Sequence, residues 1–287
     1  MSGENNLITW QRMALPALLR AAGAALPPAT AGVTALTHHI YRDPALFDAS
    51  FDQVKCAFLM TRLTCGAVPC VLVVNRLTPE VESFCGRWDI TIDYDASLPG
   101  GIPCLSRDYI ERLHERFETE YVLAIHGDGF ALRSGLEAFV GPYDYIGAPW
   151  RPSSWYTRLA FPHPRFSVGN GGFSLRSRSL CERASWYFRR KYRLIPYCYA
   201  LVDDVFYCRV LPRFEPAVRR IMTYAPPEVA GRFSFEAYDA YYPRDGEMPL
   251  GFHTVNGFNR VSRDFSGRVA AWLGETGACA PRPAGRG

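Results

Sequence analysis

The sequence predicts an α/β fold in which a mostly parallel sheet is flanked by helices. Short apolar runs typical of buried strands recur along the first half of the chain, and amphipathic segments typical of helices separate them. Strands that alternate with helices imply right-handed crossovers, and therefore parallel strands covered on both faces. With 287 residues the chain is long enough for one large α/β domain. The first half is Rossmann-like by its pattern alone.

The elements of the first half alternate regularly. Strands are predicted at 32–41 (GVTALTHHIY), 68–75 (VPCVLVVN), 89–95 (DITIDYD) and 120–128 (EYVLAIHGD), and helices at 51–65, 78–88 and 106–117. The run at 68–75 is apolar throughout, which is typical of a strand covered on both faces. Thr78 and Pro79 are suited to the N-cap and the first position of the second helix.

The two ends of the chain have weaker patterns. The apolar stretch at 13–29 is interrupted by Arg20 and by prolines and lacks a basic start, so it predicts a peripheral helix or a leader rather than a signal peptide. No segment has the roughly eighteen uninterrupted apolar residues of a membrane-spanning helix, which leaves peripheral membrane association open. The tail at 259–287 loses its pattern and ends in Pro, Gly and Arg, which predicts partial disorder.

Composition narrows the class of protein. Hydrophobic residues make up 48% and charged residues 21%, as in soluble globular enzymes. The net charge of +4 suits an anionic small substrate, and the basic residues do not form the runs of a nucleic-acid patch, so no nucleic-acid partner is expected. Nine cysteines, an odd number without any CxxC pair, argue against a disulfide framework or a zinc ribbon and favour the cytoplasm.

The end of the strand at 120–128 is the first candidate site. His126 and Asp128 lie there, and Gly127 and Gly129 flank the acid. Ligands of open parallel sheets bind beyond the carboxyl ends of the strands. The glycines let the backbone turn and let a ligand approach closely, and Asp128 offers the oxygen that a hard cation on a diphosphate needs. The alternative is an Asp-Gly turn without chemistry.

Three further motifs lie in the second half. The loop GNGG at 169–172 predicts a tight backbone turn packed against another part of the protein, or an ordinary glycine hairpin. The acidic pair Asp203 and Asp204 opens an apolar stretch, where it can serve chemistry or simply begin a helix. His253 stands alone among small and apolar residues, as a ligand or as a packed core histidine. No GxGxxG or Walker loop supports a dinucleotide or P-loop site.

Taken in order, these motifs resemble the GT-A fold of nucleotide-sugar glycosyltransferases. The resemblance covers about 31–258, and its most specific parts are YDYIGAPW (143–150), VGNGGFSLRSR (168–178) and DDVFYC (203–208). More narrowly, the chain is similar to a family of GT-A-like transferases catalogued only as a domain of unknown function. The resemblance implies one domain at 31–258, with a nucleotide-binding half at 31–130 and an acceptor half at 131–258, after an N-terminal segment at 1–30.

The resemblance also implies a metal site. GT-A enzymes such as glycogenin hold a divalent cation on the donor diphosphate with a D-x-D motif, which here reads His126-Gly127-Asp128, so the first acid is missing. Asp128 and His253 are then the implied ligands of Mn²⁺ or Mg²⁺. His126 can ligate the metal, contact ribose through a water, or do neither.

The remaining implied roles concern the donor and the acceptor. Asp204 is the implied catalytic base of an inverting transfer, and Asp203 precedes it in the acidic motif. The implied contacts to donor or acceptor are Asp203, Gly169, Asn170, Gly171, Gly172, Arg176, Trp150, His38 and His39, the two histidines near the nucleotide base. Trp150, Trp155 and Tyr156 can stack on sugar rings or pack in the core.

The predicted function is transfer of a sugar from a nucleotide-diphosphate sugar to a hydroxyl of a glycan or glycoconjugate, as in polysaccharide biosynthesis. Two alternatives remain at this point. A metal-dependent phosphoester hydrolase can use the same residues, but the missing acid at position 126 counts against it. A non-catalytic nucleotide- or sugar-binding module can keep the fold without the chemistry.

Overall fold

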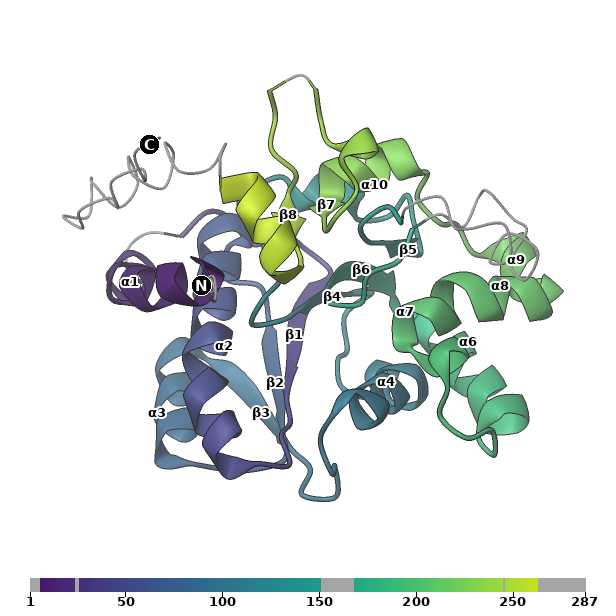
Figure 1. The fold of residues 1–287 in the computed structure, drawn as a ribbon, viewed down its shortest axis with the longest axis horizontal. Coiled ribbons are helices and arrows are strands. Elements are labelled where there is room, and N and C mark those ends of the chain that lie inside the picture. The colour runs from purple at the N-terminus through teal and green to yellow at the C-terminus, as the bar shows by residue number, and fades with distance from the viewer. Residues whose placement is uncertain (1–5, 24–25, 151–167, 245, 263–287) are drawn as a thin grey trace, which may run out of the picture.

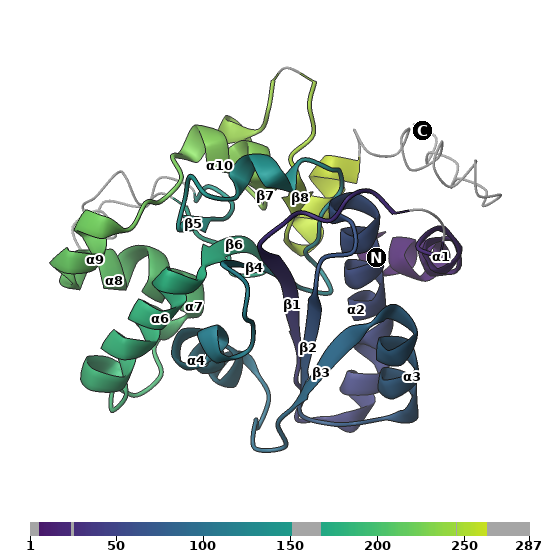
Figure 2. The same ribbon diagram turned by 180° about the vertical axis from the view of Figure 1, so that it is seen from behind.

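A six-stranded sheet with helices on both faces forms the centre of the protein (Figures 1 and 2). The computed structural model describes residues 6–23, 26–150, 168–244 and 246–262. The α/β fold with a mostly parallel sheet, predicted from the sequence, is confirmed. Trp155, Tyr156 and most of the tail at 259–287 lie outside the described residues.

The strands of the central sheet lie in the order β3-β2-β1-β4-β6-β5. They are β1 (Val33–His39), β2 (Cys70–Val74), β3 (Ile90–Tyr94), β4 (Tyr121–Ile125), β5 (Tyr145–Ile146) and β6 (Phe173–Ser177). The first four run parallel, whereas β6 lies antiparallel between β4 and β5. Ile125 at the end of β4 pairs with Phe173 at the start of β6, so the loop before β6 meets the turn after β4.

Helices cover both faces of this sheet. The α-helices named in this description of the fold are α1 (Asn6–Ala21), α2 (Pro44–Cys65), α3 (Pro79–Trp88), α4 (Ile102–Glu111), α6 (Arg178–Tyr187), α7 (Asp203–Val205), α8 (Leu211–Phe214), α9 (Pro216–Ile221) and α10 (Pro227–Phe233). Figures 1 and 2 show α2 and α3 on one face and α4 and α6 on the other. A small parallel pair, β7 (Ser234–Phe235) and β8 (Gly251–Phe252), precedes helical residues 254–262.

Local signals set where the helices begin. Thr78 caps α3 as predicted, since its side chain accepts a hydrogen bond from the backbone N–H of Val81 at 3.3 Å. The predicted start of α2 is wrong by seven residues, because the Asp43 side chain accepts from the Ala45 N–H at 2.9 Å and Pro44 occupies the first position. Likewise α4 begins at Ile102 rather than at residue 106.

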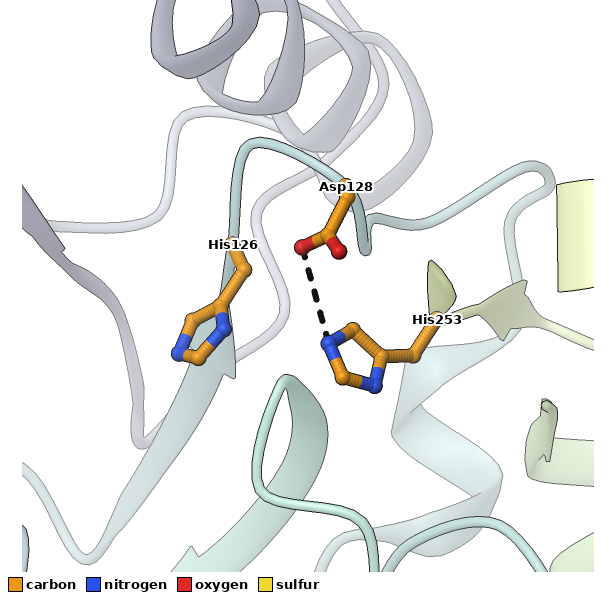
Figure 3. A group of neighbouring side chains, drawn as sticks. All are labelled: His126, Asp128 and His253. Atoms are coloured by element: carbon orange, nitrogen blue, oxygen red, sulfur yellow. Dashed lines mark ion pairs between the residues drawn. The ribbon is translucent and has the colours of Figure 1, made fainter. Parts of the chain in front are cut away.

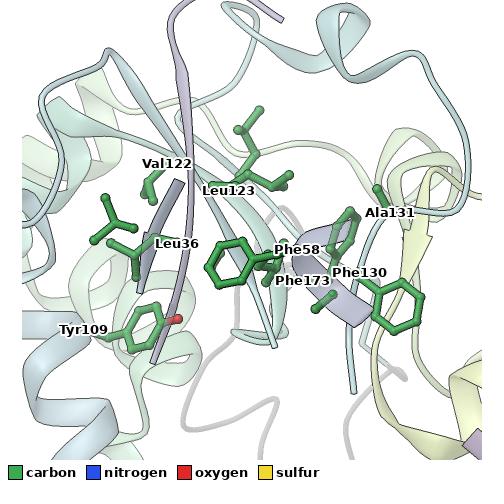
Figure 4. Close-up of a cluster of buried hydrophobic side chains, with 14 of the residues drawn as sticks. Leu36, Phe58, Tyr109, Val122, Leu123, Phe130, Ala131 and Phe173 are labelled. Carbon is green, nitrogen blue, oxygen red and sulfur yellow. The ribbon is translucent and has the colours of Figure 1, made fainter. Parts of the chain in front are cut away.

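The core lies between β1, β4 and the helices that pack on them. Figure 4 shows Leu36 of β1, Val122 and Leu123 of β4 and Phe58 of α2 in one apolar cluster, and none of the four is exposed to solvent. Each such side chain contributes about 1.5–3 kcal/mol when it is buried. This packing fixes the carboxyl ends of β1 and β4, where the candidate site lies.

The N-terminal segment is a helix packed on the domain. Leu7, Ala14 and Leu18 of α1 are buried, and α1 lies against α2. The buried Gln11 side chain donates a hydrogen bond to the carbonyl of Gly127, so α1 reaches the turn after β4. Within the described residues, no helix combines the length and the apolar character needed to cross a bilayer. The eight cysteines of the described part are all free thiols.

Candidate functional site

A two-residue turn after β4 brings His126 and Asp128 together. The strand ends at Ile125 rather than continuing to residue 128 as predicted. His126 N–H donates to the carbonyl of Gly129 at 2.8 Å, and Gly129 N–H donates back to the carbonyl of His126 at 3.0 Å. Gly127 and Asp128 form the tip of this turn. The two side chains are therefore neighbours because of the turn and not because of strand alternation.

The glycines on both sides of Asp128 lie in close contact with other parts of the protein. A Cβ on Gly127 would lie 2.9 Å from the Cβ of Gln53, and a Cβ on Gly129 would lie 2.9 Å from the carbonyl oxygen of Gly172. Such distances are too short for carbon atoms, so both positions need glycine. The sequence-based interpretation that these glycines leave space for a ligand is thus wrong, because Gln53 and Gly172 of the protein itself occupy that space.

His253 completes a three-residue cluster with the turn. Its Nε2 atom lies 3.5 Å from Oδ1 of Asp128, and its ring centroid lies 5.6 Å from that of His126. Figure 3 shows the carboxylate of Asp128 and the two imidazoles facing a common point. One ligand atom from each of the three side chains falls within 4.8 Å of the others. The three candidate metal ligands from the sequence are therefore brought together.

The charges of this cluster are strongly shifted. Burial lowers the pKa of His126 to about 4, so its imidazole is neutral at pH 7, and its Nε2 atom lies 3.3 Å from the hydroxyl of Tyr109. Burial opposes protonation of His253, but the carboxylates of Asp128 and Glu236 outweigh it and raise the pKa of His253 to about 10. Burial would raise the pKa of Asp128, yet its contact with His253 lowers that pKa to about 2.

The donor set fits a divalent transition-metal ion. Two imidazoles and one carboxylate are typical ligands of Mn²⁺ or Zn²⁺, whereas Mg²⁺ prefers an all-oxygen octahedron. His126 already offers a neutral nitrogen, and His253 would release its proton when a cation binds. Asp128 is 43% exposed, so part of its carboxylate faces solvent and remains open to a ligand.

Glu236 supports this cluster and was missed by the sequence analysis. Its Oε1 atom lies 3.5 Å from Nδ1 of His253, on the side of the ring opposite Asp128. A carboxylate on the second nitrogen of a histidine fixes the tautomer and orientation of the ring. Phe235 of β7 pairs with Phe252 of the parallel β8, so Glu236 and His253 both follow strand ends at one edge. No sequence signal identified two strands of two residues each.

The loop 169–172 connects this cluster to the acidic pair. Asn170 has a φ of 69° and its side chain accepts a hydrogen bond from the N–H of Gly172 at 3.1 Å. A Cβ on Gly172 would lie 2.1 Å from Nε2 of His253, and a Cβ on Gly171 would lie 2.5 Å from Oδ2 of Asp203. The backbone at Gly171 and Gly172 therefore packs directly between His253 and the acidic pair, and a side chain at either position would collide with one of them.

The acidic pair begins a helix and also holds the loop. Asp204 accepts hydrogen bonds from the N–H of Asn170 at 3.0 Å and of Val205 at 2.7 Å. Burial, and then the charge of Asp203, raise the pKa of Asp204 to about 6. A carboxyl with a pKa near neutrality suits a group that exchanges protons with a substrate.

Arg176 is fully buried next to the acidic pair. Its side chain is therefore not exposed for the contact with donor or acceptor that the resemblance implies. Its Nη2 atom donates to Oδ2 of Asp203 at 2.7 Å. The rings of Tyr109, Tyr145 and Tyr207 surround the guanidinium, with centroids 4.9, 5.4 and 4.7 Å from its Cζ atom. The arginine neutralises Asp203 from inside the core.

The other predicted contact residues lie nearby but are engaged with protein. Nε2 of His38 lies 2.7 Å from Oδ2 of Asp108, and its side chain is buried. His39 contacts the carbonyl of Phe47 at 2.9 Å, and burial lowers the pKa of His39 to about 4. The ring of Trp150 packs on Gly169 and lies 4.3 Å from the guanidinium of Arg209, which agrees with the packing interpretation.

A cavity of about 350 Å³ opens beside the turn. Its walls come from α1, the end of β1, α2, the start of α4 and residues 126–128, with Ile8, Gln53 and Ile102 among them. Its volume is in the range of small-molecule sites. Gln53 and the residues of α1 were not identified from the sequence, because they lie on helices whose pattern indicates packing alone.

About half of the chain matches a known protein family. A model of the family described as "Protein of unknown function (DUF5672)" matches residues 109–253, which include the turn, the loop, the acidic pair and His253. A search of curated proteins gave no significant match.

Several solved structures are similar at the level of overall shape. The mannosyltransferase PcManGT from Pyrobaculum calidifontis, in complex with GDP-Man and Mn2+, is 12% identical, with a TM-score of 0.39 and coverage of 97% of this chain and 74% of that one. Glucosyl-3-phosphoglycerate synthase from Mycobacterium tuberculosis is 12% identical, with a TM-score of 0.39 and coverage of 93% and 85%. The mannosyltransferase Ktr4p from S. cerevisiae is 9% identical, with a TM-score of 0.39 and coverage of 73% and 74%.

Proposed function

This chain belongs to the DUF5672 family, and we propose that it transfers a sugar from a nucleotide-diphosphate sugar to a hydroxyl of a glycan or glycoconjugate. The observation that carries the proposal is the cluster of His126, Asp128 and His253 beside a cavity of about 350 Å³. A cavity of this size accommodates part of a nucleotide, and the cluster lies where its diphosphate would meet a cation.

The three clustered side chains would hold the cation. Asp128 contributes an oxygen, and His126 and His253 contribute nitrogens that come within 4.8 Å of it. When bound, the cation supplies electrostatic stabilisation of the negative charge that develops on the leaving diphosphate. Because two of the three ligands are imidazoles, we expect Mn²⁺ to be preferred over Mg²⁺.

Asp204 is the proposed base that accepts the proton of the acceptor hydroxyl. Its pKa of about 6 leaves it ionised at pH 7 and close to the pH at which proton transfer is most effective. Its hydrogen bonds to Asn170 and Val205 fix the carboxylate at the loop 169–172, which also contacts His253. A base of this kind belongs to an inverting transfer, so we propose inversion of the anomeric centre.

The compartment and the pathway are part of the proposal. Six of the described cysteines are buried free thiols, which fits a protein kept in a reducing environment such as the cytoplasm: Cys56, Cys65, Cys70, Cys85, Cys181 and Cys208. A transferase of nucleotide sugars in that compartment would act in polysaccharide biosynthesis.

A thermal-shift screen tests the donor. The purified protein is heated with UDP-, GDP-, CMP- and dTDP-sugars, each with Mn²⁺, with Mg²⁺ or without metal. A ligand at about a hundred times its dissociation constant adds about 2.7 kcal/mol to the free energy of unfolding. We expect one nucleotide to raise the melting temperature only with metal, and more with Mn²⁺ than with Mg²⁺.

The matched variants are Asp128→Asn and Asp239→Asn. Asp128→Asn removes the anionic ligand and should abolish the metal-dependent shift, whereas Asp239, a residue 73% exposed outside the cluster, should be replaceable without effect. A metal-dependent shift that persists in Asp128→Asn would contradict the proposed site.

A further inference from the structure

The segment 183–202 combines positive charge with a lack of acidic residues. It holds five basic residues and no Asp or Glu: Arg183, Arg189, Arg190, Lys191 and Arg193. The sequence-based statement that basic residues form no runs is wrong for Arg189–Arg190–Lys191. After α6 the chain forms a wide helical turn at 188–192 and then an irregular stretch.

Large apolar side chains in the same segment face solvent. Leu194 is 96% exposed, Tyr199 65% and Trp186 50%, and Ile195 and Tyr197 are also exposed. Single exposed apolar residues are ordinary on protein surfaces, but five within residues 186–199 concentrate apolar surface in one segment, and we refer to this segment as the patch. The patch covers the end of α6 and the residues after it, at the end of the molecule opposite α1 and α3 (Figures 1 and 2).

The positive charge of this patch is only partly neutralised. Arg189 pairs with Glu115 at 2.6 Å, and Lys191 pairs with Glu215 at 2.7 Å. Arg190 lies with its guanidinium 4.1 Å from the ring centroid of Trp186. Within the described ranges, neither Arg190 nor Arg193 lies within ion-pair distance of a carboxylate. Two cationic groups thus remain beside the exposed apolar side chains.

We propose that residues 186–199 form a docking surface for an anionic membrane. Basic side chains attract anionic headgroups, tryptophan and tyrosine favour the interface, and an exposed Leu194–Ile195 pair can enter the acyl boundary. A nucleic acid would complement the charge but would leave Leu194 and Ile195 in water. The inference rests on the surface alone and does not depend on the proposed function.

Vesicle flotation of the full chain tests this surface. The two preparations are phosphatidylcholine vesicles and vesicles in which about a third of the lipid is phosphatidylglycerol. We expect binding to the anionic vesicles, weakened by added salt, and at least tenfold weaker binding to phosphatidylcholine alone, because roughly 1 kcal/mol per basic residue is lost. Equal binding to both, or none to the anionic vesicles at low salt, would overturn the proposal.

A matched pair of variants locates the surface. Arg193→Glu with Leu194→Ser should weaken binding to the anionic vesicles at least about tenfold. The control is Arg76→Glu with Leu77→Ser, another exposed Arg-Leu pair, which should bind as the unmodified protein does. Melting temperatures of both variants establish that they are folded, since all four side chains are exposed.

Two further outcomes would overturn the proposal. If both double variants lose vesicle binding equally, the attraction is a property of the net charge and the proposal is wrong. If sedimentation velocity shows dimers that the Arg193→Glu, Leu194→Ser variant abolishes while vesicle binding persists, the patch binds a second copy and not a membrane.

Discussion

Asp204 is half-buried and adjoins a second acid, Asp203, and both conditions disfavour a charged carboxylate unless other groups compensate. Its two backbone hydrogen bonds favour the ionised form, whereas burial and Asp203 disfavour it, and the pKa settles at about 6. Arg176 limits the repulsion by neutralising Asp203. The proton affinity of Asp204 therefore depends on groups from β6, the loop 169–172 and α7 together.

The pH dependence of turnover should follow this residue. Below about pH 6 Asp204 is protonated and cannot accept a proton, so the rate should fall as pH decreases through this value and level off above it. Asp204→Asn should lower kcat by about 10²- to 10⁴-fold and leave donor binding in place. Initial rates between about pH 5 and pH 8, with calorimetry of the donor, measure both.

Turnover of this variant and of the unmodified protein separates a transferase from a binding module. If Asp204→Asn retains full turnover, Asp204 is not the base. If the unmodified protein binds a nucleotide sugar with metal but transfers nothing to any acceptor offered, the chain is a binding module that kept the fold.

Glu236 should matter through His253. Replacing Glu236 by Gln removes the charge 3.5 Å from Nδ1 while keeping the shape of the side chain, so the ring loses its electrostatic partner. Loss of such a carboxylate costs about 10- to 100-fold in metal affinity. We expect titration of Mn²⁺ without nucleotide to show this weakening, and the melting curve of the metal-free variant should still show a folded protein, at a temperature lowered by the loss of the Glu236–His253 ion pair. Glu228→Gln, at an exposed position in the first turn of α10, is the control, and equal metal affinity in both would contradict the role of Glu236.

At the scale of elements, the loop 169–172 depends on its three glycines, which allow close packing on both sides. It passes between His253 and the acidic pair, and each of its glycines lies against another group of the protein. The antiparallel pairing of β6 with β4 places this loop beside the turn at 126–129. The site is thus assembled from connections that meet at one edge of the sheet.

Gly172→Ala tests this assembly. The added methyl group would lie 2.1 Å from Nε2 of His253 and must displace the ring, so we expect the Mn²⁺-dependent thermal shift to disappear. Gly86→Ala is the matched control, because its methyl group would meet no atom within 4 Å and alanine favours the helix by about 1 kcal/mol. Retention of the shift in Gly172→Ala would show that His253 is not a ligand.

At the scale of the whole molecule, the cavity depends on elements far apart in the sequence. α1 supplies Leu7 and Ile8 to its wall and holds Gly127 through Gln11, although α1 lies outside the residues that the family model matches. A ligand in this cavity would therefore contact α1 and the turn at once.

Hydrogen exchange should reveal this coupling. With nucleotide and Mn²⁺ bound, we expect slower exchange in α1, at the start of α4 and at residues 126–129, because a ligand in the cavity stabilises all three. The peptide spanning α9 is an internal control, since it does not line the cavity. Protection confined to α9 or spread evenly would place the nucleotide elsewhere.

Much of the first half was predictable from the sequence because its signals are local. The apolar run of β2, the cap at Thr78 and the alternation of strands with helices depend on neighbours along the chain. Element boundaries were less predictable, as for α2, where an Asp43 cap moved the start. The antiparallel β6 and the two-residue strands β7 and β8 have no comparable local pattern.

By itself, the sequence determined the α/β class, and it offered His126 and Asp128 as candidate ligands because they follow a buried strand. His253 entered as a candidate only through the resemblance to GT-A enzymes. Only the tertiary structure decided what the residues contact. In the structure Asp203 pairs with Arg176, and His39 is buried in the core. The space beside Asp128 is filled by protein groups. Glu236 lies beside His253, and α1 lines the cavity. The physical reason is that local patterns fix secondary structure, whereas charge pairing and burial depend on residues brought together from across the chain.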